Sequence, residues 1–190
     1  PHLRSRMHVA EELGSGRVPT TVLRAAIIIG SGSASYEILE HLVRKLAILP
    51  IPYWGRTRCQ PITIRDVIKY LVGVLEKPET VGASFDIGGS DVLTYEAMMR
   101  VIAEVLGKKR LFFHSFLSNI RIYAYITGLL TPVPAQITRS LMEGLQNDVV
   151  CLDRRISKLV PFRTLTYRES VIRALLREEQ DTVDTRWSDA

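Results

Sequence analysis

The chain has 190 residues, 46% hydrophobic and 24% charged, which is the ordinary composition of a soluble globular protein. The net charge of +5 comes from scattered Lys and Arg residues, so it favours an anionic ligand such as a phosphate and argues against nucleic-acid binding. No apolar run is long enough to span a membrane, no signal peptide is present, and two cysteines without metal-ligand spacing indicate a reducing, cytoplasmic compartment and no metal site.

The chain begins within a helical pattern. Residues 3–13 place apolar side chains on one helix face, and the glycines of residues 14–16 end the helix. Because this pattern starts at Pro1 and the chain closes on a polar tail, residues 181–190, we expect both ends to continue in a longer protein.

The most informative stretch is the apolar, β-branched run at residues 20–29, which is followed by Gly30, Ser31 and Gly32. A run without alternation predicts a parallel strand buried on both faces. Ligands of open α/β sheets bind beyond the carboxyl ends of the strands, so residues 25–33 are the first candidate site. A core strand that ends in a flexible turn is the alternative.

The next elements alternate between helix and strand. Ser35 predicts the N-cap of a helix through residue 46, and a proline-containing loop follows that carries Arg56 and Arg58. Residues 59–63 suggest a short strand, and Thr63 with Asp66 suggests a capping box. A helix follows through residue 76, and its inward-facing side chains are expected to be Val67, Ile68, Leu71, Val74 and Leu75.

The second half of the chain is mostly helical. Residues 85–89 predict a strand and a turn, Thr94 caps a helix that Gly107 ends, and residues 111–113 form a candidate edge strand. Residues 118–130 form an unusually apolar helix, for which we expect packing within the chain or a homo-oligomer interface. A capping box at residues 166–169 opens the last helix. The order of elements predicts the α/β class with a helical appendage.

Four segments, taken in order, resemble the carboxyl-terminal half of an extended or atypical short-chain dehydrogenase/reductase. The similarity is greatest to the sugar-nucleotide-epimerase-like, NAD(P)H-binding branch. The segments are residues 5–12 (SRMHVAEE), 21–30 (TVLRAAIIIG), 60–67 (QPITIRDV) and 84–89 (SFDIGG). The resemblance implies the last strands of a Rossmann-like parallel sheet and a mostly helical C-terminal substrate lobe. It divides the chain into residues 1–89 and 90–179, with residues 180–190 as a linker to a further domain.

The resemblance also assigns binding residues. Arg24, Ala25, Ala26, Ile27 and Ile28 would line the nicotinamide end of NAD or NADP in the longer parent protein. The substrate would be a small molecule, and the residues that would contact it are Gly30, Ser31, Gly32, Ser33, Arg56 and Arg58. Two arginines can grip phosphate oxygens in a bidentate manner. Solvated surface charges are the alternative for this pair.

The family's catalytic Tyr and Lys, four residues apart on one helix, are replaced here by His2 and Arg6. A histidine can exchange protons near neutral pH, whereas an arginine only donates hydrogen bonds. Both are therefore candidate catalytic residues, and the alternative is that they are ordinary polar positions of a helix that has lost this role.

The glycine-rich turn that holds a dinucleotide pyrophosphate, Gly-x-Gly-x-x-Gly, does not occur in the sequence. We therefore expect a fragment of an NAD(P)-dependent oxidoreductase or epimerase that is inactive as this chain. Two rivals are a non-catalytic NAD(P)H-binding regulator or assembly subunit, and a lipid or quinone binder that uses the apolar helix.

Overall fold

The structure, a computed structural model, describes residues 2–116 and 119–179; the expected linker at residues 180–190 lies outside them. The helices are α1 (His2–Gly14), α2 (Ala34–Lys45), η1 (Tyr53–Arg56), α3 (Ile64–Leu75), η2 (Pro78–Thr80), α4 (Tyr95–Val105), α5 (Ile120–Leu130), α6 (Ala135–Gly144), α7 (Arg155–Leu159) and α8 (Tyr167–Glu179). The strands are β1 (Val22–Ala25), β2 (Ile28–Ile29), β3 (Ile48–Ile51), β4 (Arg58–Cys59), β5 (Ile62–Thr63), β6 (Ser84–Ile87), β7 (Leu93–Thr94) and β8 (Leu111–His114).

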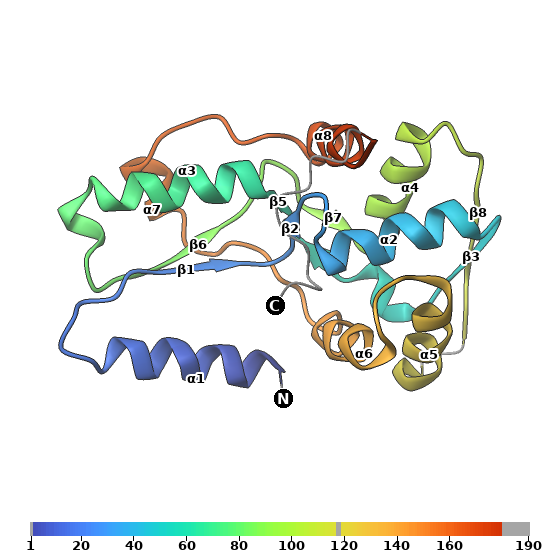
Figure 1. Cartoon of the computed structure of the whole chain (residues 1–190), viewed down its shortest axis with the longest axis horizontal. Helices are drawn as coiled ribbons and strands as arrows, with labels where there is room; N and C mark the ends of the chain where they lie inside the picture. The colour runs from blue at the N-terminus through green and yellow to red at the C-terminus, as the bar shows by residue number, and fades with distance from the viewer. Residues whose placement is uncertain (1, 117–118, 180–190) are drawn as a thin grey trace.

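The strands associate in pairs that are distant in sequence. β1 pairs with β6, β2 with β5 and β3 with β8, all three in parallel, whereas β4 and β7 are antiparallel. Helices connect the parallel partners, as such crossovers require. In Figure 1, α1 and α3 lie on opposite sides of β1 and β6, and α2, α4, α5, α6 and α8 gather at the other end of the molecule.

The strand predicted at residues 20–29 is two short strands. β1 ends at Ala25, and β2 begins only at Ile28. Between them the carbonyl of Ile27 accepts a hydrogen bond from the amide of Ile62, 2.9 Å away, so the chain changes partner from β6 to β5. The burial of β1 is also incomplete, because Arg24 is exposed. The predicted single strand, buried on both faces, is therefore wrong in detail.

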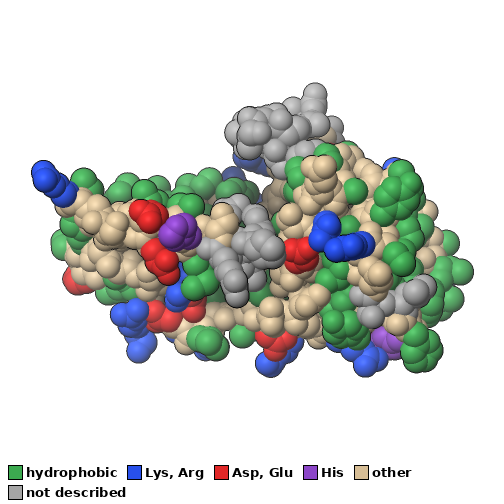
Figure 2. All heavy atoms as spheres, turned by 90° about the horizontal axis from the view of Figure 1, so that it is seen from below, with side chains coloured by type: hydrophobic (Ala, Val, Ile, Leu, Met, Phe, Trp, Pro, Cys, Tyr) green, Lys and Arg blue, Asp and Glu red, His purple; other side chains and the backbone are tan. Residues whose placement is uncertain are grey.

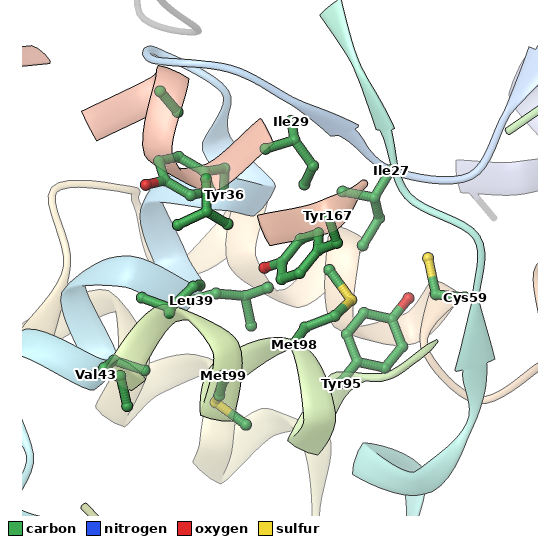
Figure 3. Packing of buried hydrophobic residues seen from close by; sticks show 14 of the residues in the cluster. Ile27, Ile29, Tyr36, Leu39, Val43, Cys59, Tyr95, Met98, Met99 and Tyr167 are labelled. Carbon is green, nitrogen blue, oxygen red and sulfur yellow. The ribbon is translucent and has the colours of Figure 1, made fainter. Parts of the chain in front are cut away.

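The largest core joins α2, α4, α8 and the residues around β2. Three tyrosines, Tyr36, Tyr95 and Tyr167, are buried among aliphatic and Met side chains, as Figure 3 shows. The hydroxyls of Tyr36 and Tyr167 have no hydrogen-bond partner within the described residues. This core holds α2 and α8 against the strand end that precedes the predicted binding turn.

A second core lies between α3 and the β1·β6 pair. Val67, Tyr70 and Val74 of α3 contribute to it, together with Phe85 and Ile87 of β6. The sequence also predicted Ile68, Leu71 and Leu75 to face inward, but these side chains are exposed, Leu75 by 85%. The true inward face of α3 therefore follows Val67, Tyr70 and Val74, which recur at helical spacing.

Several predicted helix caps are present. The Thr94 hydroxyl accepts from the Ala97 amide at 3.1 Å, and Gly107, at φ 64°, ends α4. At α8 the capping box is reciprocal: Thr166 and Glu169 each accept a hydrogen bond from the other's backbone amide, at 3.2 and 2.7 Å. These caps satisfy amides that a helix leaves unpaired at its first turn.

One predicted cap is wrong, and a second forms without its predicted side-chain hydrogen bond. The N-cap of α2 is Ser33 rather than Ser35, which lies within the helix, and no side-chain cap bond forms there. Thr63 is the N-cap of α3 but makes no side-chain cap bond either. Asp66 instead accepts hydrogen bonds from the Leu165 amide at 2.8 Å and from Lys69 Nζ at 3.0 Å.

The apolar helix α5 packs against α6 and α2. Only Ala124 and Thr127 are buried, whereas Ile122, Tyr125, Ile126 and Leu129 remain 46–69% exposed. Figure 2 shows apolar side chains gathered at this end of the molecule. Within the described residues, no helix is both long and apolar enough to cross a membrane. Packing within the chain therefore covers only part of α5.

Candidate functional site

Arg24, on β1, is the charged residue of the predicted nicotinamide-side strand. Its Nε and Nη2 atoms donate to Asp86 Oδ1 on β6, at 2.9 and 2.8 Å. Asp86 Oδ2 accepts from the backbone amides of Leu152 and Asp153, both at 3.2 Å. The arginine is 60% exposed, but the carboxylate is only 17% exposed. This ion pair therefore ties β1, β6 and the segment before α7 into one unit.

The remaining predicted cofactor residues continue from Arg24 to β2. Ala25, Ala26 and Ile28 are half-buried, and Ile27 belongs to the large core. Ala25 packs against the core below α3, and Ala26 packs against the large core. The structure thus keeps these five residues in one continuous segment, and their contact with a nicotinamide stays a prediction.

The predicted substrate turn, Gly30 to Ser33, joins β2 to α2. Gly32 has a φ of 82°, a conformation that glycine adopts without strain, and the Ser33 hydroxyl donates to the Ile28 carbonyl at 2.8 Å. A Cβ atom at Gly30 would lie 3.0 Å from Ile64 Cγ2. Gly30 therefore allows close packing of β2 on α3.

This turn does not fit a dinucleotide pyrophosphate. Such a site requires glycine backbone that is open to the phosphates and a helix N-terminus that points at them. Gly30 is instead covered by Ile64, and the Ser33 hydroxyl is engaged with the chain's own backbone. At Gly30 and Ser33 the turn therefore lacks the open backbone and free hydroxyl that a phosphate cradle requires.

Arg56 and Arg58, the predicted phosphate-binding pair, have different partners. Arg58 donates to both carboxylate oxygens of Asp148, through its backbone amide at 2.7 Å and Nε at 2.8 Å. Arg56 Nη2 lies 3.2 Å from the ring nitrogens of His114, whose Nε2 is 3.2 Å from Glu96 Oε2. Burial opposes ionisation of Glu96, but Arg100 and His114 together lower its pKa. Of this pair, Arg56 therefore has no carboxylate partner among the residues that the structure describes.

His2 and Arg6 belong to α1, where four-residue spacing puts both positions on one helix face. Their side chains lie outside the described residues, so their predicted catalytic roles stay predictions. On the same helix Met7 and Leu13, expected to form its apolar face, are 63% and 55% exposed.

Sequence analysis did not identify a cavity of about 160 Å³ at the carboxyl end of β6. Gly88 and Gly89 form part of its wall, and Asp86 connects it to Arg24. The only local sequence pattern that could have indicated this cavity is the pair of glycines after the predicted strand at residues 85–89. The other walls come from segments as far away in sequence as Thr164, which no local pattern links to the glycines. Among the described residues, no cluster of His, Cys, Asp and Glu is arranged to hold a metal ion.

Comparison with known proteins supplies the wider context. No protein-family model matches the chain. Residues of the chain are 25% identical, over 105 positions, to a mitochondrial protein of Arabidopsis thaliana, NADH dehydrogenase [ubiquinone] 1 alpha subcomplex subunit 9. The match covers 55% of this chain and 26% of that protein, so the chain matches about a quarter of its relative's length.

Solved structures share the fold at low identity. UDP-glucose 4-epimerase of Thermotoga maritima, solved with UDP-glucose, superposes with a TM-score of 0.63 at 12% identity, over 95% of this chain and 52% of that one. UDP-glucuronic acid 4-epimerase of Bacillus cereus, with UDP-glucuronic acid and NAD, gives 0.59 at 16% identity, over 91% and 48%. RMD of Pseudomonas aeruginosa, with NADPH, gives 0.56 at 14% identity, over 85% and 48%.

These similarities confirm the predicted fold class, a Rossmann-like α/β arrangement of parallel strand pairs with a largely helical remainder. The chain spans about half the length of the solved structures it matches. At these identities the likeness concerns the fold alone.

Proposed function

We propose that this chain is the substrate-side portion of an NAD(P)-binding protein of the short-chain dehydrogenase/reductase type. The parent protein would bind NAD(H) or NADP(H) and reduce or epimerise a small substrate. The observation that carries the proposal is the match of nearly the whole chain to about half of proteins solved with NAD or NADPH.

In this proposal the chain supplies three parts. The segment from Arg24 to Ile28 lies along the nicotinamide end, and the turn from Gly30 to Ser33 faces the substrate. Arg56, which is exposed and has no carboxylate partner among the described residues, meets a phosphate of the substrate. The dinucleotide phosphates are held by residues outside this chain, because Ile64 packs closely against Gly30 of its own turn.

A non-catalytic NAD(P)H-binding regulator or assembly subunit is the second candidate. Two observations favour it: His2 and Arg6 stand where the resemblance places a catalytic Tyr and Lys, and the matched Arabidopsis protein is named as a subunit of NADH dehydrogenase. Arginine cannot lose its proton at physiological pH, so Arg6 binds a ribose without taking part in proton transfer.

Calorimetric titration of the 190-residue chain with NADH and with NADPH tests whether the phosphate-binding part of the cofactor site is missing from this chain. We expect no binding tighter than about 1 mM, since the phosphate cradle accounts for much of the affinity of such sites. A micromolar dissociation constant would show that the chain forms a complete dinucleotide site and would contradict the proposal.

Turnover by a longer form of the protein that includes a dinucleotide-binding part distinguishes the two candidates. If His2 is a general acid or base, His2→Ala lowers the rate about a hundredfold or more. A longer protein that binds NADH without turning over carbonyl or sugar-nucleotide substrates supports the regulator. Binding of a quinone analogue that Ile126→Asp abolishes would instead support a lipid or quinone binder that uses α5.

A further inference from the structure

The cavity at the carboxyl end of β6 is a second candidate site, separate from the predicted substrate turn. Its volume of about 160 Å³ is close to the roughly 150 Å³ of an engineered protein cavity that takes up benzene. The walls come from β6 and the glycines after it, from α3, from α7 and from the loops on either side of α7. The lining residues are Gln60, Tyr70, Asp86, Gly88, Gly89, Cys151, Asp153, Arg154, Ile156, Ser157, Phe162 and Thr164.

The wall at Gly88 and Gly89 is closely packed, which fixes the shape of the cavity. A Cβ atom at Gly88 would lie 2.7 Å from Cys151 Sγ and from Gln60 Cδ. Gln60 is held at both ends of its amide, because it donates to the Gly89 carbonyl at 2.7 Å and accepts from the Cys151 amide at 3.0 Å. The cavity is thus bounded by a hydrogen-bonded frame.

Both carboxylates of the lining are already neutralised. Asp86 is paired with Arg24 and accepts from two backbone amides. Asp153 accepts from the Arg155 guanidinium, with the shortest contact at 2.7 Å, and from the Arg155 amide at 2.9 Å. The two acidic groups therefore have little remaining capacity to hold a cation or a ligand donor.

The groups that remain without partners are donors. The Tyr70 side chain is 4% exposed, and its hydroxyl makes no hydrogen bond to any described residue, although it lines the cavity. The Arg154 guanidinium and the Thr164 hydroxyl likewise have no hydrogen-bond partner among the described residues. The Tyr70 hydroxyl is therefore available to donate to a ligand acceptor in the cavity.

The thiol of Cys151 adds no negative charge to the cavity. Burial raises its pKa to about 11, Asp86 acts in the same direction, and Arg154 opposes them. The thiol is therefore protonated at neutral pH. One unpaired cationic group, Arg154, thus faces a cavity whose other charged groups are balanced.

The remaining walls are apolar. The rings of Tyr70 and Phe162 lie 4.6 Å apart between centroids, at an angle of 53°, and Ile156 completes this side. We propose that the cavity binds a small organic carboxylate, whose acid group accepts hydrogen bonds from Arg154 and the Tyr70 hydroxyl. The apolar body of the ligand lies against Phe162, Ile156 and the Tyr70 ring.

Benzoate is a suitable probe, because its ring matches the cavity volume and its carboxylate matches the donors. Its affinity for the 190-residue chain can be measured by ligand-observed NMR and by protection of Cys151 from alkylation. We expect a dissociation constant of about 1 mM or below, and a loss of about tenfold or more in Tyr70→Phe and in Arg154→Gln. Tyr70→Phe keeps the ring and so preserves the packing.

Arg65→Gln is the matched control. Arg65 is exposed on α3 and does not line the cavity, so this variant removes the same charge and should bind benzoate within about twofold of the parent chain. The proposal is overturned if benzoate does not bind, if Arg154→Gln binds it as well as the parent chain does, or if benzyl alcohol binds as tightly as benzoate.

Discussion

Cys151 lies half-buried in the wall of the cavity, between Gly88 and Arg154. Only the thiolate reacts with alkylating agents, so the raised pKa of this thiol predicts slow alkylation at neutral pH. The fraction of thiolate should rise about tenfold for each pH unit between pH 8 and pH 10, because the pKa near 11 lies above that window. Alkylation by iodoacetamide, followed by intact mass spectrometry, should therefore accelerate throughout this range.

A rate that is half-maximal near pH 8.5 and levels off by about pH 9.5 would contradict this prediction, because it would indicate a thiol with the pKa of an ordinary cysteine. Cys151→Ser provides the control. The remaining thiol, Cys59, is 0% exposed, and burial raises its pKa to about 11 as well. That variant should stay unlabelled while the fold is intact.

At the scale of single elements, the starts of α2 and α8 provide a paired test. Thr166→Ala removes one half of the reciprocal cap of α8 and should lower the free energy of unfolding by about 1 kcal/mol. Ser35→Ala is the contrasting change, because Ser35 lies inside α2, where alanine is the better helix former. Urea denaturation followed by circular dichroism measures both.

Equal destabilisation by the two alanine variants would mean that Ser35 caps α2 in solution, contrary to the structure. An unchanged free energy of unfolding in Thr166→Ala would show that the Glu169 carboxylate alone stabilises the first turn of α8, without the Thr166 hydroxyl. Both outcomes are resolved by denaturation curves, provided that the slope with urea is unchanged.

The helices illustrate what the sequence can and cannot predict. Caps formed within four residues, such as Thr94 with Ala97 and Thr166 with Glu169, are recognisable because both partners are local. The role of Asp66 is not recognisable from the sequence, since its Oδ2 accepts a hydrogen bond from Leu165, 99 residues away. The exposure of Leu75 is equally unpredictable from its own helix, because it depends on which neighbour covers each face of α3.

The same distinction applies to the candidate site. The segment from Arg24 to Ser33 was identifiable, because a strand followed by glycines is a local pattern. The partner of Arg24 was not, since Asp86 is supplied by a strand 62 residues later. The cavity combines side chains from even more distant segments. From the sequence, Tyr70 is indistinguishable from other buried residues of α3, because the loop from Phe162 to Thr164 that lines the cavity with it is far away in the chain.

At the scale of the whole molecule, the exposed face of α5 predicts association between copies of the chain. Exposed apolar patches on soluble proteins commonly mark interfaces. Ile126→Asp should leave the melting temperature within a few degrees of the parent value, because Ile126 is 49% exposed. In sedimentation velocity at about 100 μM, we expect self-association of the parent chain and its loss in the variant, since a buried aspartate is costly in an interface.

Gln136→Asp, on the exposed surface of the neighbouring α6, carries the same added charge and serves as the control. A parent chain that sediments as a monomer at every concentration would exclude an interface between copies. Unfolding of Ile126→Asp would mean that α5 is covered within the chain more completely than the structure shows.

The bond from the Leu165 amide to Asp66 also bears on how the protein is made. Asp66 is fully buried, and while Lys69 of the same helix donates to its Oδ1, its Oδ2 gains its partner only after Leu165, 99 residues later, has joined the fold. Closing so long a loop costs entropy before the contact is gained, and such non-local topologies fold slowly. During synthesis α3 leaves the ribosome well before its partner segment, at about 5–20 residues per second. For several seconds the nascent chain therefore leaves this carboxylate oxygen without its native backbone partner.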